Sequence, residues 1–189
     1  MSDTAATAFD AVRFRLNGVE RTLDVADIAD VHLIDLVRDR FGLMAAKESC
    51  GIGRCGSCLM LVNGRAVNGC LMMAWQLDGA DVVTPEGLAA LPEGRAVQAA
   101  LTAEVSFQCG YCAAGFTLAL TALFMRDPNA DAASIRAALS GNLCRCTGYA
   151  SILRGAALAQ TELARRRAVA AHQSYEFASE ETKHADRAG

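Results

Sequence analysis

The first regular pattern in the chain is an alternation of apolar and basic side chains. Residues 12–16 read Val-Arg-Phe-Arg-Leu, which is the two-residue period of a half-buried strand. Asn17-Gly18 follows at once and is typical of a tight hairpin turn, so Thr22–Val25 is predicted as the return strand. The same arrangement recurs where Leu59–Val62 precedes Asn63-Gly64. The pattern therefore predicts two hairpins of short strands.

A helical pattern lies between the two predicted hairpins. Four apolar residues recur with helical spacing and share one face of that helix, namely Leu33, Leu36, Val37 and Phe41. Asp30 is the predicted N-cap of the helix, and Gly42 is its predicted end. Val82–Thr84 is predicted as a last short strand. Hairpin, helix, loop and hairpin in this order predict an N-terminal β-grasp domain over residues 10–85.

The pattern changes after Pro85, where no further strand period is found. Residues 86–94 are rich in proline and glycine and are predicted as a linker. Alanine-rich helical periods then follow at Arg95–Phe107, Ala114–Met125, Ala132–Ser140 and Ser151–Ala168. Short connections between helices favour an antiparallel four-helix bundle over residues 95–168. Residues 169–189 lack a sustained pattern and are predicted as a polar C-terminal tail. The whole chain is thus predicted as an α+β protein of two domains.

Composition and charge narrow the class of protein. The chain has 189 residues, of which 52% are hydrophobic, so it is able to bury a core. Its formal net charge of −3 does not suggest nucleic-acid binding. The N-terminus lacks the pattern of a secretory signal, and the longest nearly apolar run, Cys112–Met125, is too short for a membrane span. We therefore expect a cytoplasmic protein whose eight cysteines are reduced and bind metal.

Four of the cysteines lie in or just after one glycine-rich loop. Cys50, Cys55 and Cys58 have the C-x4-C-x2-C spacing of a plant-type [2Fe–2S] site, with Cys70 as a fourth ligand further on. The glycines among them allow a tight curl that turns backbone N–H groups toward an anionic core. A hairpin centred on Asn63-Gly64 returns the chain to Cys58. Zinc is the alternative, although zinc sites usually combine two close cysteine pairs.

The other four cysteines form a second constellation in the helical region. Cys109 and Cys112 lie between the first two predicted helices, and Cys144 and Cys146 lie between the last two. In an up-down-up-down bundle these two connections lie at the same end, so the four thiols are predicted to meet there. Spacing alone leaves an iron–sulfur cluster and a zinc ion equally open at this second site.

Three sequence motifs show a family resemblance that covers most of the chain, from about Val12 to about Ala157. ESCGIGRCGSC, FQCGYC and GNLCRCTGY, in this order, resemble the small iron–sulfur subunit of the xanthine oxidase family of molybdenum hydroxylases. The resemblance implies a plant-type ferredoxin-like [2Fe–2S] domain followed by a helical [2Fe–2S]-binding domain. It assigns one cluster to Cys50, Cys55, Cys58 and Cys70, and the other to Cys109, Cys112, Cys144 and Cys146.

The same resemblance implies an electron-transfer subunit of a molybdenum-dependent oxidoreductase, with no substrate site of its own. Its large partner subunit holds the molybdenum cofactor, as molybdopterin cytosine dinucleotide, and Gln108 and Cys146 are placed against the pterin. Electrons pass through both clusters to FAD in a medium subunit or to another acceptor, while an N-heteroaromatic or aldehyde substrate is hydroxylated with water. The implied assembly is a heterotrimer or a dimer of heterotrimers. No nucleic-acid partner and no membrane span are expected.

Two classes of function compete with this interpretation, namely a freestanding ferredoxin-like carrier or redox sensor and a zinc-stapled interaction module. The sequence also departs from the family at Ala113-Ala114, where Thr-Pro is usual. A proline in the first turn presets its own backbone angle, so its absence is expected to cost about 0.5–1 kcal/mol. Trp75 is predicted to lie in the core or in an interface.

Overall fold

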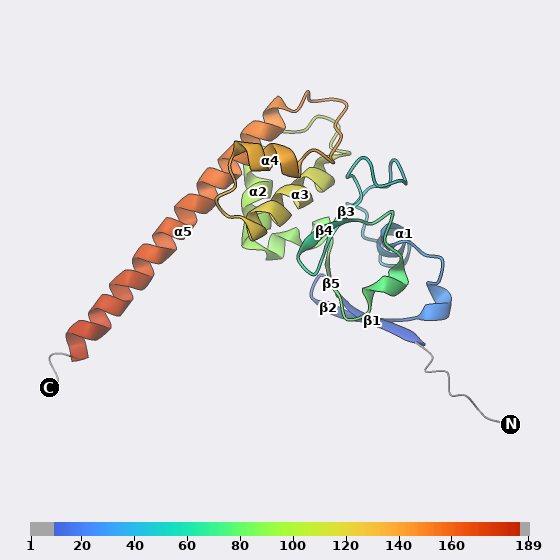
Figure 1. Cartoon of the computed structure of the whole chain (residues 1–189), viewed down its shortest axis with the longest axis horizontal. Coiled ribbons are helices and arrows are strands. Elements are labelled where there is room, and N and C mark those ends of the chain that lie inside the picture. Colours follow the sequence, from blue (N-terminus) through green and yellow to red (C-terminus); the bar gives the residue numbers. More distant parts are fainter. Residues whose placement is uncertain (1–9, 186–189) are drawn as a thin grey trace.

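The computed structural model describes residues 10–185, with side chains described as far as residue 171. A sheet unit lies at the N-terminal end and a helical unit at the C-terminal end (Figure 1). The sheet is mixed, and its strands have the order β2-β1-β5-β3-β4. The strands are β1 Ala11–Leu16, β2 Val19–Asp24, β3 Leu59–Val62, β4 Arg65–Asn68 and β5 Asp81–Val83. Strand β5 pairs parallel with β1 and antiparallel with β3, and so joins the two hairpins.

Both predicted hairpins are confirmed. Asn17 and Gly18 have φ values of 50° and 81°, and Asn63 and Gly64 have φ values of 51° and 74°. Two successive positive φ values are the mark of a type I′ turn, which asparagine followed by glycine adopts at little cost. Strand β2 ends at Asp24, one residue earlier than predicted, because Val25 begins a short 3₁₀ turn at Val25–Asp27.

The helix of the sheet unit is shorter and more irregular than predicted. It consists of α1, Leu33–Asp35, and a wider π turn, η2, at Leu36–Arg40. Asp30 does not cap it, because the N-cap position is His32, which makes no side-chain capping bond. The backbone after β4 takes this role instead, since the N–H groups of Leu33 and Ile34 donate to the carbonyls of Met72 and Gly69 at 2.8 and 3.1 Å.

One hydrophobic core lies between this helix and the sheet. Its fully buried members come from β1, the helix, β3 and β5, among them Phe14, Leu33, Val37, Met60 and Val82. Phe41, at the end of the helix, packs edge-on against Phe14 with ring centroids 6.3 Å apart. The predicted apolar helix face is therefore confirmed as the face that meets the sheet.

The segment 86–94, which was predicted as a linker, is ordered and helical over most of its length. A 3₁₀ helix, η4, occupies Pro85–Ala90, and α2 begins at Pro92 and ends at Ala103. Proline suits both starts because its fixed φ and missing N–H cost nothing in a first helical turn. Leu88 is fully buried, and a Cβ on Gly94 would lie 2.2 Å from the Leu88 carbonyl oxygen. Close packing, rather than flexibility, is what this glycine provides.

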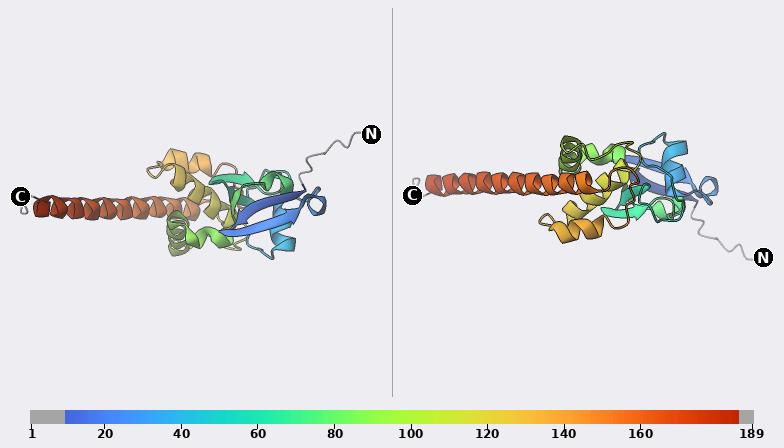
Figure 2. Two further views of the ribbon diagram at one scale, coloured as in Figure 1. Left: turned by 90° about the horizontal axis from the view of Figure 1, so that it is seen from below. Right: turned by 90° about the horizontal axis from the view of Figure 1, so that it is seen from above.

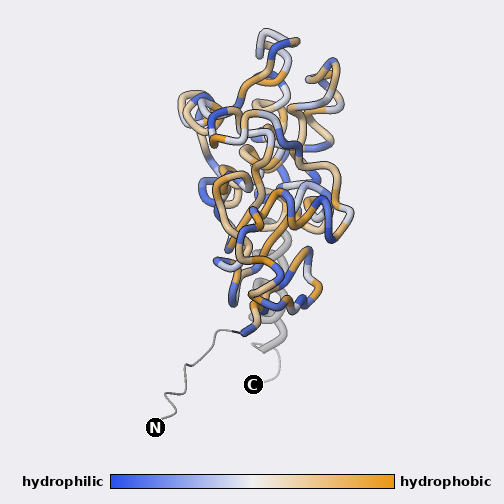
Figure 3. The backbone as a smooth tube through the Cα atoms, turned by 90° about the vertical axis from the view of Figure 1, so that its right-hand side faces the viewer, coloured by the Kyte–Doolittle hydropathy of each residue, from blue (hydrophilic) through white to orange (hydrophobic). Residues whose placement is uncertain are grey.

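The remaining helices are α3 Ala113–Arg126, α4 Ala132–Ala138 and α5 Ala150–Ala185. Their shared core includes Phe116, Leu120, Ile152 and Ala156, all fully buried. Hydrophobic segments occur through both the sheet unit and the helical unit (Figure 3). Among the residues that the structure describes, no helix is long and apolar enough to cross a membrane.

Helix α5 is much longer than predicted, because it continues past Ala168 to Ala185. Its 36 residues span roughly 54 Å at 1.5 Å per residue. The C-terminal half projects away from the rest of the chain (Figure 2). The predicted end of the last helix at Ala168 was therefore wrong, and residues 186–189 of the predicted polar tail lie outside the described part.

Candidate iron–sulfur centres

The first four cysteines meet beside the β3–β4 hairpin, as predicted. Cys50 and Cys55 lie in the loop before β3, and the Cys55 side chain is near enough to help lower the pKa of Cys50. Cys58 precedes β3 and Cys70 follows β4, and the Cys70 thiol is near enough to help raise the pKa of Cys58. The hairpin register explains this second pair, because Leu59 lies opposite Asn68. The result is two thiol pairs rather than one compact group of four.

Backbone N–H groups surround this first site. The loop turns through positive φ at Gly51, Gly53 and Gly56. The N–H of Gly53 points at the Cys70 sulfur, and the N–H of Arg54 points at the Cys50 sulfur, each at 3.3 Å. Amide hydrogens that converge in this way stabilise negative charge on sulfur.

The thiol pKa values of the first site differ because their surroundings differ. The N–H groups of Ile52 and Arg54 lower the pKa of Cys50 to about 6. Burial raises the pKa of Cys58 to about 11, and hydrogen bonding and charge repulsion with the Cys70 thiol add to this effect. Because metal ligands are thiolates, loading of this site releases the thiol proton that Cys58 holds.

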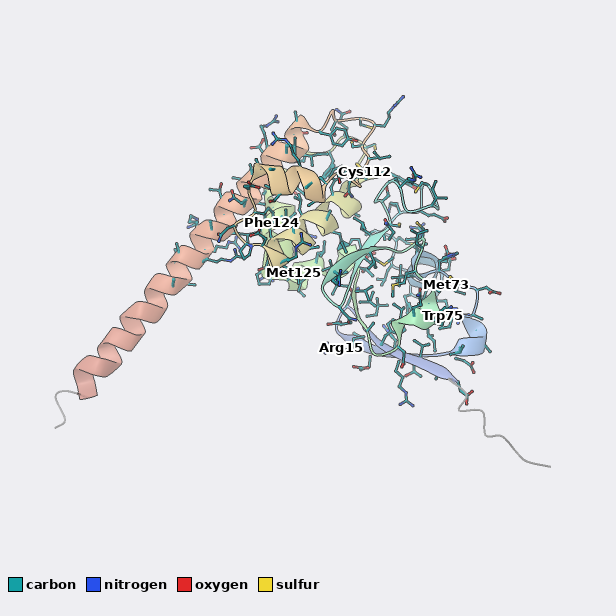
Figure 4. The ribbon with its side chains drawn as sticks, in the orientation of Figure 1. Arg15, Met73, Trp75, Cys112, Phe124 and Met125 are labelled. Carbon is teal, nitrogen blue, oxygen red and sulfur yellow. The ribbon has the colours of Figure 1, made fainter. Side chains whose placement is uncertain are left out.

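The second four cysteines also meet, at the end of the helical unit nearest the first site. Cys109 and Cys112 precede α3, and Cys144 and Cys146 lie between α4 and α5. The sulfurs of Cys109 and Cys146 are 3.7 Å apart, and Cys112 is hydrogen-bonded to Cys144. Cys112 lies at the start of α3, on the side facing the sheet unit (Figure 4). The predicted convergence of the two connections is therefore confirmed.

The two thiol pairs of the second site differ in depth. Cys109 and Cys146 are exposed, whereas Cys112 is buried and Cys144 is half-buried. Burial, followed by hydrogen bonding and charge repulsion with Cys144, raises the pKa of Cys112 to about 12. Burial also raises the pKa of Cys144, but hydrogen bonds from the Thr147 hydroxyl and from nearby N–H groups lower it more, so that it lies below the ordinary value. Gln108 is exposed beside the outer pair.

The pairwise arrangement fits a two-iron cluster better than a single ion. A structural zinc site gathers four ligands around one point, whereas each iron of a [2Fe–2S] core takes two cysteines. All eight cysteines lie in the described part of the chain and are free thiols. Their donor chemistry and their pairs therefore fit two [2Fe–2S] clusters.

Sequence reasoning missed the contacts that join the two sites. The N–H of Leu143, next to Cys144, donates to the carbonyl of Cys55 at 3.0 Å. The buried Asn142 amide reaches the carbonyl of Gly56 at 3.5 Å. Helix α3 also comes so close that a Cβ on Gly115 would lie 2.1 Å from that carbonyl oxygen. The sequence shows only an asparagine two residues before Cys144, and its burial is known from the structure alone.

A second link ties the loop of the first site to the start of α3. The hydroxyl of Tyr111, between Cys109 and Cys112, donates to the backbone carbonyl of Glu48. The two sites are thus fixed relative to each other by side-chain and backbone bonds at both edges of their junction. Trp75, by contrast, is 46% exposed, so the core assignment considered for it was wrong and an interface role stays a prediction (Figure 4).

Comparison with known proteins places the chain in a family. The family described as "[2Fe-2S] binding domain" matches residues 84–157, which include the four cysteines of the second site. A probable xanthine dehydrogenase subunit of Bacillus subtilis is 44% identical over 151 residues, which are 80% of this chain and 87% of that protein. The nicotinate dehydrogenase small FeS subunit of Eubacterium barkeri is 38% identical over 141 residues, 75% of this chain and 88% of that protein.

A solved structure agrees with these relatives. A chain of quinoline 2-oxidoreductase from Pseudomonas putida 86 superposes with a TM-score of 0.72 and 31% identity, over 82% of this chain and 96% of that one. Its length is therefore almost wholly matched, which makes it a counterpart of this chain rather than of one segment. The chain belongs to the small iron–sulfur subunits of the xanthine oxidase family of molybdenum hydroxylases.

Proposed function

We propose that the chain carries electrons between two [2Fe–2S] clusters that its eight cysteines hold. Cys50, Cys55, Cys58 and Cys70 hold one cluster, and Cys109, Cys112, Cys144 and Cys146 hold the other. When bound, these clusters accept and release single electrons. The observation that carries the proposal is the pairing of thiols within each set, together with the backbone bond of 3.0 Å from Leu143 to Cys55 that joins the sets.

The fold supports a division of the chain into two cluster-binding domains. We assign residues 10–85 to a β-grasp, ferredoxin-like domain, since the mixed sheet places its parallel β1–β5 pair between two hairpins. The helices that begin with α2 correspond to the four-helix bundle, and α5 extends it. Segment 86–94 belongs structurally to the junction between the domains. The chain itself then contributes ligands, amide hydrogens and a rigid spacing, and it contributes no substrate site.

The exposure of the thiols supports an order for the two sites. Cys109, Cys146 and Gln108 are exposed at the outer edge of the helical site. A large subunit that holds a molybdenum cofactor would cover this edge, with Gln108 and Cys146 beside the pterin. Leu143 and Cys55 then connect the inner edge to the first site. We infer that electrons enter at the helical site and leave from the ferredoxin-like site. A freestanding carrier would leave the outer thiol pair uncovered.

The implied complex follows from the relatives. A large subunit would carry molybdopterin, in the cytosine dinucleotide form, and a medium subunit would carry FAD, unless another acceptor takes its place. We propose a heterotrimer, or a dimer of heterotrimers, in the cytoplasm, where free thiols persist. An N-heteroaromatic compound or an aldehyde is the proposed class of substrate. Two relatives are named as nicotinate dehydrogenase and quinoline 2-oxidoreductase. A further relative, 34% identical, is named as the iron-sulfur-binding subunit of an Escherichia coli aldehyde oxidoreductase.

Serine substitutions test the assignment of ligands. Reduced wild-type chain should give two distinguishable iron–sulfur EPR signals. Cys55→Ser should remove or strongly alter one signal, and Cys112→Ser should remove or strongly alter the other, because each cysteine belongs to a separate set. Each variant serves as the control for the other. Loss of the same signal in both variants would contradict the assignment.

A further inference from the structure

Thr147 is the feature of the helical site that the ligand assignment leaves unexplained. It follows Cys146 directly and precedes the start of α5. Its hydroxyl oxygen lies 3.1 Å from the sulfur of Cys144. The same oxygen accepts the backbone N–H of Tyr149 at 3.2 Å. A hydroxyl has one proton, so with Tyr149 as donor to the oxygen, that proton is left for the sulfur.

Tyr149 completes a closed ring of hydrogen bonds. Its hydroxyl accepts the backbone N–H of Cys144 at 3.0 Å, while its own N–H binds the Thr147 hydroxyl. Tyr149 has a φ of 68°, which is unusual for a residue with a side chain. Its ring packs against buried Phe116 with centroids 6.1 Å apart. The left-handed backbone is what allows the ring and the N–H of this one residue to reach Cys144 and Thr147 together.

The bond from Thr147 is distinctive among the eight thiols. The sulfurs of Cys50 and Cys70 receive backbone N–H groups, which no side-chain substitution removes. Within the described part of the chain, no other cysteine sulfur receives a hydrogen bond from a hydroxyl group. Among the described residues, Thr147 therefore supplies the one hydroxyl group directed at a ligand sulfur, and it lies at the helical site.

We propose that Thr147 is a positioning residue that raises the reduction potential of the cluster held by Cys109, Cys112, Cys144 and Cys146. The inference rests on the proposed function, since it assumes a [2Fe–2S] cluster at these thiols. One-electron reduction adds one negative charge, part of which spreads onto the thiolate sulfurs, and no bond is formed or broken and no proton is required. A hydrogen bond to sulfur is stronger when the sulfur carries more negative charge, as it does in the reduced cluster. The bond therefore stabilises the reduced state and favours reduction. Tyr149 holds the donor in place.

The test is an EPR-monitored redox titration of the full chain with its clusters. T147V keeps the shape of the side chain and removes the donor. It should lower the equilibrium constant for reduction of the helical cluster about tenfold relative to the other cluster, which is about 59 mV for one electron. T147S restores the donor and should restore the potential. T161V is the matched control, because the hydroxyl of Thr161 binds only the Ala157 carbonyl on α5, at 3.0 Å.

The outcomes distinguish failure of the inference about Thr147 from failure of the proposed function. Equal potentials in T147V and wild type, with both signals retained, would overturn the inference and leave the proposed function intact. A wild-type chain with a single signal would instead overturn the proposed function. If T147V fails to load its helical cluster, the Y149F variant is titrated instead. It breaks the ring of hydrogen bonds at the Tyr149 hydroxyl and leaves the four cysteine ligands and the Thr147 hydroxyl unchanged. A fall in the same potential in Y149F supports the inference, and an unchanged or higher potential overturns it.

Discussion

Substrate should no longer reduce the ferredoxin-like cluster in an assembled complex that carries Cys112→Ser. Cys112 is the buried ligand of the helical site, and this site lies between the molybdenum subunit and Cys55 in the proposed order. Loss of the entry site should therefore abolish substrate-driven reduction of the outer site, while dithionite, which needs no internal route, still reduces it. Rapid-freeze EPR after a single turnover measures both.

Cys55→Ser provides the reciprocal control in the same complex. Because it affects only the exit site, substrate should still reduce molybdenum and the helical cluster, and delivery to the final acceptor should fail. Normal substrate-driven reduction of the outer cluster in the Cys112 variant would show that the proposed order of the two sites is wrong.

Gly115→Ala should separate the two cluster sites and destabilise the chain. The new Cβ would lie 2.1 Å from the Gly56 carbonyl oxygen, a backbone atom that cannot turn aside as a flexible side chain can. Overpacking of this kind costs about 1–3 kcal/mol. Alanine stabilises a helix by about 1 kcal/mol relative to glycine. A net loss of stability in this variant would therefore come from the steric clash. Urea unfolding measures the loss, and EPR should show weakening of the cluster ligated by Cys55.

Gly141→Ala is the matched control for this substitution. Gly141 also lies near the junction, yet a Cβ there meets nothing within 4 Å and its φ is not in the left-handed region. This variant should keep the wild-type stability and both signals. If Gly115→Ala is as stable as Gly141→Ala and retains both clusters unchanged, then the close approach of α3 to the cluster loop contributes neither to stability nor to cluster binding.

The sequence predicted those parts of the fold that depend on residues close together in the chain. The two Asn-Gly turns need positive φ at successive residues, and few other dipeptides provide it. The ferredoxin-like thiols were predictable because their loop and hairpin are contiguous in sequence. The second set required topology as well, since Cys112 and Cys144 meet only if helix connections share one end of a bundle.

The contacts between the two units could not be predicted, because they depend on packing between distant segments. Nothing local marks Leu143 as a donor to Cys55, or Gly115 as the point where α3 meets the cluster loop. The failure of Asp30 as a cap has a similar cause, since the backbone carbonyls of Gly69 and Met72 satisfy the N–H groups that a cap would have served. The length of α5 was missed because its polar end lacks an apolar face.

Metal and sulfide analysis of the purified chain distinguishes two [2Fe–2S] clusters from bound zinc. Two sets of four cysteines, each in two pairs, should hold two [2Fe–2S] clusters. We expect four irons and four acid-labile sulfides per chain, with zinc well below one equivalent. Stoichiometric zinc with little sulfide would contradict this expectation.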